Sequence, residues 1–239
     1  MDHLDGLKDF FDTFEVLNVW DTDNKKEMVD FKSGGYNKED WDFYKSIRDG
    51  NATNRRTYFA SNVNKYYDED SIRILAPTRS LLKEANECGD YNDCSYVLLF
   101  TPPKKGGKQW KILFAGDSHD KTWDYILEKY NSEVSDIDVL VAPHHGRDSN
   151  RSYTFLNTLN PKMTLMGNAS SKHLAYNSYT GIKITNNQAG YVILNISPER
   201  LGVYVKNQEF ANDFRIRGQW EQATYNTRHQ AFFLFQYSA

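Results

Sequence analysis

The chain has 239 residues, of which 39% are hydrophobic and 15% aromatic, with a formal net charge of −3. This composition is typical of a folded protein and excludes a disordered chain, and the charge excludes an overall basic field for nucleic acid, although a local groove needs only a few cations. No apolar run is long enough to span a bilayer and no signal peptide opens the chain, so we expect a cytoplasmic protein with no membrane segment. Cys88 and Cys94 are close enough to pair, but we favour two free thiols.

The first third of the chain combines short regular segments with a long irregular one. Apolar spacing predicts a helix over residues 4–14 and a strand over 15–21. Residues 23–67 are polar and rich in aromatics, which indicates a surface insertion, and inside it Asn37 or Asp40 is expected to cap a helix that ends at Gly50. A strand over 71–76, ended by Pro77, and a short helix or turn over 78–87 follow.

From Ser95 onward, predicted strands and helices alternate. The strands are 95–100, 111–116, 138–143, 162–167, 189–196 and 201–206, and the helices are 120–130 and 152–159. The first two and the last two strands form hairpins, so a layered α/β fold with mixed sheets is predicted. The tail ends in a strand-like AFFLFQY, whose place in the fold the sequence does not indicate.

Three stretches place acids and histidines beside the ends of predicted elements. FAGDSH ends a strand at Asp117, APHHG ends the next strand at His144 and His145, and MDHLDG places Asp2 and His3 before a helix. Such side chains suit a Zn²⁺ or Mn²⁺ site with nitrogen and oxygen ligands. Taken singly, Asp117 could be a helix cap, the histidines structural, and Asp2-His3 without meaning. Together they are more specific.

These motifs carry a resemblance to a known family. DHLDGL matches the second half of the H-x-H-x-D-H signature of the metallo-β-lactamase superfamily. NDCSYVLLF, FAGD, APHHGR and MGNASSKHLA follow in the order of its ComEC-like branch, named for the C-terminal domain of a DNA-uptake channel protein, with Arg147 in place of Ser and Leu174 in place of Pro. The match covers residues 1–206 apart from the insertion.

The resemblance implies an α/β fold of the αβ/βα sandwich type with two mixed sheets, incomplete at the N-terminus. The family domain would span residues 1–206, followed by a C-terminal extension over 207–239. The two leading histidines of the signature and an N-terminal hairpin layer would lie upstream of Met1. We therefore expect the natural protein to begin earlier, or a partner to complete the sheet.

The resemblance also implies a dinuclear metal site, of which at most one half would be well formed in this chain. Asp117 would bridge the two metals, and Asp2, His3 and one of His144 or His145 would hold the second. Asp93 stands where many members have a histidine, so it either tunes the site towards Mn²⁺ or is a turn residue.

The implied activity is hydrolysis of a phosphodiester by metal-activated water, as in a nuclease, with Asp2 in the catalytic group. His173 would be a general acid or phosphate contact, or else a loop histidine, and Asn168 would orient the substrate or close a turn. Arg147 is a candidate phosphate anchor or a surface arginine, and Asp93 and Ser95 complete the substrate-side candidates. The alternatives are hydrolysis of a small phosphoester, cyclic nucleotide or lactone, and a non-catalytic module that needs an upstream segment or partner.

Overall fold

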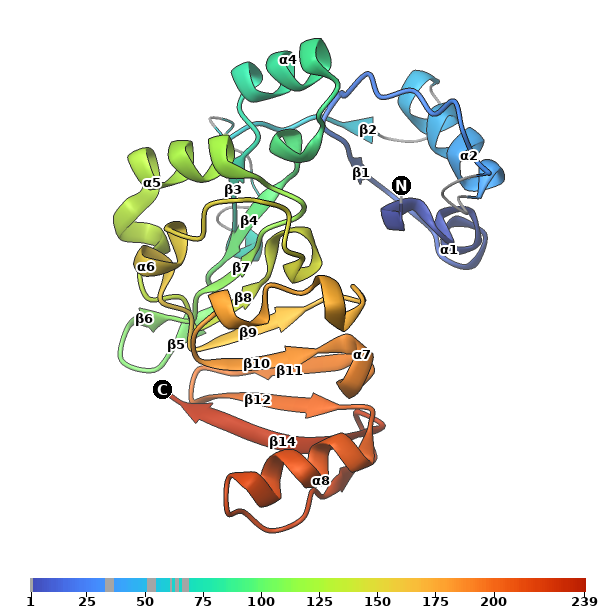
Figure 1. Cartoon of the computed structure of the whole chain (residues 1–239). Helices are drawn as coiled ribbons and strands as arrows, with labels where there is room; N and C mark the ends of the chain where they lie inside the picture. The colour runs from blue at the N-terminus through green and yellow to red at the C-terminus, as the bar shows by residue number, and fades with distance from the viewer. Residues whose placement is uncertain (1, 33–36, 51–54, 61, 63–64, 66–68) are drawn as a thin grey trace.

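The structure is a computed structural model that describes residues 2–32, 37–50, 55–60, 62, 65 and 69–239, and only the backbone of Asp2. Its centre is a six-stranded sheet with the order β10-β9-β8-β7-β4-β3 (Figure 1). The strands are β3 (Ile72–Ala76), β4 (Val97–Phe100), β7 (Ile112–Phe114), β8 (Val139–Val141), β9 (Met163–Met166) and β10 (Ile182–Thr185). β7 to β10 run parallel, whereas β3, β4 and β7 are antiparallel. The predicted mixed α/β sheet is thus confirmed.

A second sheet has four strands in the order β11-β12-β14-β13. They are β11 (Val192–Ile196), β12 (Arg200–Val205), β13 (Tyr225–Asn226) and β14 (Ala231–Ser238). All its pairings are antiparallel, so the expectation of two mixed sheets is wrong for this one. The reason is local, since β11–β12 and β13–β14 are each joined by a connection too short for a parallel crossover. The tail that the sequence left unplaced supplies α8 (Gln208–Arg217), β13 and β14.

Two hydrophobic clusters lie on opposite faces of the six-stranded sheet. Neighbouring residues of β7 belong to different clusters: Leu113 packs with Trp123 of α5 and Phe155 of α6, and Ile112 packs with residues of β12 and β14. Because successive side chains of a strand point to opposite faces, helices cover one face and the second sheet covers the other. The covering helices are α5 (Asp120–Val134) and α6 (Phe155–Leu159), with α4 (Arg79–Cys88) beside them (Figure 1).

The N-terminal segment differs from the predicted single helix. A 3₁₀ turn (η1, Asp2–Leu4) precedes α1 (Leu7–Thr13), and Gly6 separates them at φ 79°. No residue of α1 is buried, so its apolar stripe does not face the core, and Phe10 is 53% exposed. The strand predicted over 15–21 shortens to β1 (Val19–Trp20), which pairs with β2 (Arg55–Arg56).

The helix predicted inside the insertion is confirmed as α2 (Lys38–Asp49). The Asn37 side chain accepts a hydrogen bond from the Glu39 N–H, and Gly50 ends the helix. Part of the predicted insertion lies outside the described residues. Both cysteines are free, as expected, and no helix of the described chain is long and apolar enough to cross a membrane.

Candidate metal centre

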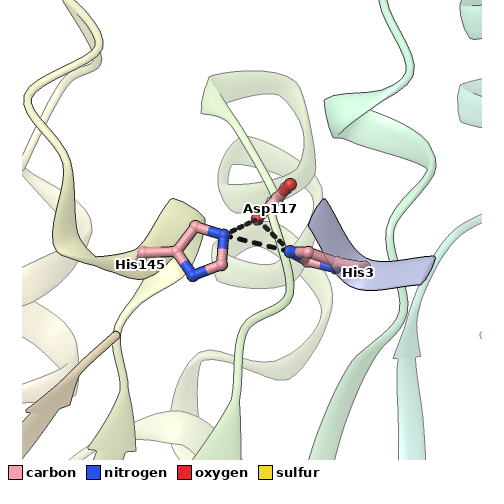
Figure 2. A group of neighbouring side chains, drawn as sticks. All are labelled: His3, Asp117 and His145. Atoms are coloured by element: carbon pink, nitrogen blue, oxygen red, sulfur yellow. Dashed lines mark hydrogen bonds and ion pairs between the residues drawn. The ribbon is translucent and has the colours of Figure 1, made fainter. Parts of the chain in front are cut away.

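The parallel strands bring the predicted ligands to one edge of the six-stranded sheet. Asp117 follows β7 and His145 follows β8, and the carboxyl ends of neighbouring parallel strands open at the same edge. His3 arrives from the other end of the chain, on η1. Figure 2 shows the three side chains pointing toward one another from these separate segments.

The three side chains form a compact triangle of donor atoms. The two histidine Nε2 atoms are 3.1 Å apart, and Oδ1 of Asp117 lies 3.4 Å from Nε2 of His3 and 3.8 Å from Nε2 of His145. Tetrahedral zinc, with bonds of about 2.0–2.1 Å, separates its ligand atoms by roughly 3.3–3.4 Å. The three distances therefore fit ligands of one ion.

The hydrogen bonding at Asp117 separates this interpretation from a simple polar cluster. A neutral imidazole donating to another would explain the contact between His3 and His145. Oδ1 of Asp117 is buried and makes no full hydrogen bond with a described residue, and its contact with Nε2 of His3, at 3.4 Å, is an ion pair only when that ring is protonated. A buried acceptor without a partner costs about 1–3 kcal/mol, and a bound cation would remove that cost. Oxygen and imidazole nitrogen are also the donor set that Zn²⁺ and Mn²⁺ accept.

Electrostatics favours the ligand forms of these groups. Burial by itself would raise the pKa of Asp117, but its close contact with His3 and the charges of His144 and His145 outweigh burial, so the pKa is lowered. Burial lowers the pKa of His144, against the opposing effect of Asp117. Asp117 is thus ionised near neutral pH, as a metal ligand must be, whereas His144, which precedes the candidate ligand His145, tends to be neutral.

The turn that carries both histidines has an uncommon backbone. His144, His145 and Gly146 all have positive φ angles, 50°, 59° and 80°. Such conformations cost about 1–3 kcal/mol each for residues other than glycine. Three backbone bonds from other loops hold the turn: His144 N–H donates to Gly116, and the carbonyls of His145 and Gly146 accept from Gly167 and Ala175. A turn over-determined in this way is typical of functional sites.

Asp117 is held by residues of the NDCS stretch. The Ser95 hydroxyl accepts a hydrogen bond from the Asp117 N–H at 3.2 Å. Oδ1 of Asp93 accepts from the N–H groups of His119 and Thr122 at 3.0 and 3.1 Å, so Asp93 caps α5. Asp93, and not Asp117, therefore caps the helix that follows β7. Capping does not explain the carboxylate at Asp117.

The other predicted residues are not part of this cluster. Among the side chains that the structure describes, the group that could hold a metal ion consists of His3, Asp117 and His145 and does not include His144. Arg147 and Asn168 are exposed on the loops after β8 and β9. His173 is exposed on a neighbouring turn, where its carbonyl accepts from the Asp148 N–H at 2.7 Å. The Asp2 side chain lies outside the described residues.

Two supporting residues escaped sequence reasoning. Arg151 is only 5% exposed, and its guanidinium donates to the carbonyl of Ser118, next to Asp117, at 2.6 Å. Gly167 lies against His145: a Cβ there would be 2.7 Å from Nδ1 of that ring and 3.0 Å from its Cβ. Arg151 lies in a polar stretch of sequence that does not indicate burial. Gly167 follows a predicted strand, where a glycine usually indicates only a turn. The sequence therefore did not mark either residue as part of the site.

Replacing Gly167 by alanine should weaken metal binding without unfolding the protein. The added methyl would push the His145 ring out of the triangle, and we expect zinc affinity to fall about 10- to 100-fold, as for other changes that misorient a ligand. Overpacking should cost about 1–3 kcal/mol of stability. Calorimetric zinc titration would measure the first effect and thermal unfolding the second.

The control for this substitution is Ser170→Ala, an exposed position on the same loop. It should leave zinc affinity unchanged. In a His145→Ala background, Gly167→Ala should have no further effect on affinity. A drop of the same size in that background would show that Gly167 does not act through His145.

Comparison of the chain with protein-family models, with curated proteins and with solved structures gives no match. The case for a function therefore rests on the motif residues and on the geometry of this centre.

Proposed function

We propose that the chain is a metal-dependent hydrolase of phosphodiesters, of metallo-β-lactamase type, with His3, Asp117 and His145 as metal ligands. The observation that carries the proposal is the convergence of the buried Oδ1 of Asp117 with the Nε2 atoms of His3 and His145, at 3.4 and 3.8 Å. The layering of helices, six-stranded sheet and second sheet is consistent with this superfamily but does not by itself specify it.

Access to the centre supports catalysis over a purely structural role. The His3 side chain is 50% exposed, whereas those of His145 and Asp117 are 27% and 22% exposed, so the cluster opens to solvent on the side of His3. Three protein ligands with one open position are the pattern of catalytic rather than structural zinc. A divalent ion so held lowers the pKa of water and polarises a substrate oxygen.

The residues on the loops after β8 and β9 suit a phosphate better than an uncharged ester. Arg147 follows the histidine turn directly and is exposed, and a guanidinium binds phosphate oxygens with two parallel hydrogen bonds. We assign phosphate contacts to Arg147 and His173, and orientation of the substrate to Asn168. These assignments carry over the motif roles, and the exposure of all three side chains permits them.

The test uses the purified chain with bis(p-nitrophenyl) phosphate, the corresponding monoester and a simple lactone as substrates. We expect about one tightly bound metal per chain, release of nitrophenol from the diester, loss of turnover with EDTA and recovery with Mn²⁺ or Zn²⁺. Faster hydrolysis of the monoester or the lactone would show that the substrate is not a phosphodiester but belongs to that other class. A chain that binds no metal would remove the proposal.

A pair of histidine variants makes this test specific. His145→Ala should lose metal and turnover together. His229→Ala should change neither, because that ring packs against Tyr204 in the second sheet, 4.6 Å between centroids. Equal losses in both variants would indicate adventitious binding by histidines in general.

A further inference from the structure

The position of His3 poses a structural problem, because little of its own segment is buried. The side chain is half exposed, and α1, which follows it, has no buried residue. A ligand on a segment without a core would lose its place by local fraying. Something outside the segment must fix it.

The fixing contact comes from the insertion. Asp40, on α2, is 3% exposed, and its carboxylate accepts two backbone hydrogen bonds from the segment: Gly6 N–H to Oδ2 at 2.9 Å and Lys8 N–H to Oδ1 at 3.0 Å. These two bonds lower the pKa of Asp40, so the group is ionised at neutral pH. Bonds from N–H groups to an ionised carboxylate are about twice as strong as neutral ones. The rings of Phe11 and Phe43 add a packed contact at 5.0 Å between the same two helices.

The insertion is in turn attached to Tyr96, just before β4 and next to the Ser95 that binds Asp117. The Tyr44 hydroxyl, on α2, donates to Oδ1 of Asp21 at 3.0 Å. The hydroxyl of Tyr96 donates to the Asp21 carbonyl at 2.9 Å. Tyr96 follows Ser95, which accepts the hydrogen bond from the Asp117 N–H. A continuous set of contacts thus runs from Asp117 through the insertion to the segment that carries His3.

We propose that Asp40 is a positioning residue that sets His3 at the metal centre by binding the Gly6 and Lys8 N–H groups. This inference rests on the proposed function and deepens it, because it gives the insertion a role. From outside the sheet, α2 holds the segment that carries the ligand His3. Asp40 does not touch the metal ligands, so it acts only through the backbone that carries His3.

The experiment titrates the full chain with Zn²⁺ alone and compares Asp40→Asn with Asp42→Asn. Asparagine keeps the size of Asp40 but turns one acceptor into an NH₂ donor that faces a backbone N–H. We expect zinc affinity to fall about 10- to 100-fold. Asp42 lies two residues along the same helix and pairs with Lys38 at the surface, so its variant should bind as the parent does.

A double-substitution cycle shows whether Asp40 acts through His3. In a His3→Ala background, Asp40→Asn should cause no further loss of affinity, whereas independent effects would add. Amide hydrogen exchange gives a second readout: the Gly6 and Lys8 amides should be protected in the parent and exchange faster in Asp40→Asn, while those of β7 and β8 keep their protection. This pattern would also show that the variant remains folded.

The possible outcomes separate the two proposals. Failure of the parent chain to bind zinc would remove the proposed function itself. Tight binding by the parent together with unchanged affinity in Asp40→Asn would overturn the positioning role alone. An equal loss with and without His3 would also overturn it, since Asp40 would then act elsewhere.

Discussion

Replacing Asp117 by alanine is expected to abolish phosphodiester hydrolysis and to lower zinc affinity more than about 100-fold, since even changes outside the ligand shell cost 10- to 100-fold. Asp117 is the one anionic group among the three proposed ligands, and its Oδ1 lies 3.4 and 3.8 Å from the Nε2 atoms of the two histidines. Without it, two neutral imidazoles remain, too few to hold a divalent ion tightly at neutral pH. Isothermal titration with Zn²⁺ and a diester assay would measure both effects.

The same variant should lose the stabilisation that added zinc gives the parent. In the metal-free protein the effect of burial on the pKa of Asp117 is outweighed by the imidazoles around it, which lower that pKa, so the ionised carboxylate adds to stability near neutral pH and Asp117→Ala should be somewhat less stable than the parent. Added Zn²⁺ should raise the melting temperature of the parent and leave that of Asp117→Ala unchanged. An equal gain in both proteins would show that Asp117 does not hold the metal. Asp124→Ala, at an exposed site on α5, serves as the control.

Gly116→Ala is expected to be the most destabilising single substitution near the centre. Gly116 has φ +55°, and a Cβ there would lie 2.8 Å from the carbonyl oxygen of Tyr96 and 3.0 Å from Cβ of Ser95. The left-handed backbone and the overlap together should cost about 2–5 kcal/mol, which lowers the melting temperature by roughly 4–20 °C in a chain of this size. Metal affinity should also fall, because Asp117 is the next residue.

Gly106→Ala provides a matched control for that substitution. Gly106 has the same kind of backbone, φ +79°, but nothing lies within 4 Å of an added Cβ. It should therefore cost only the left-handed conformation, about 1–2 kcal/mol, and leave metal binding intact. If the two variants were equally stable, the close approach of the strands at Gly116 would not constrain the site.

The sequence predicted the central sheet well because its signals are local. Apolar runs such as those that became β7, β8 and β9 end at Gly or Pro, and each is short enough to be a strand. The same logic placed Asp117 and His145 at neighbouring strand ends. The pairing of β14 between β12 and β13 could not be predicted, because partner choice depends on contacts between residues distant in sequence.

The N-terminal segment shows where the sequence signal misled. Its apolar spacing predicted one helix over residues 4–14, yet Gly6 interrupts that helix and no residue of α1 is fully buried. Periodicity reports that a face is apolar but not that a partner covers it. Asp40 looked like a candidate cap for its own helix, whereas its carboxylate binds the backbone of another segment. Only the tertiary arrangement reveals that contact.

The place of β14 has a consequence for the order of folding during synthesis. The strand lies between β12 and β13, and Leu234 and Phe235 belong to the cluster that also contains Ile112 and Val139 of the central sheet. One face of that sheet thus stays partly uncovered until residues 231–238 have left the ribosome. A nascent chain stalled before Ala231 should therefore expose apolar surface of β7 and β8 to chaperones.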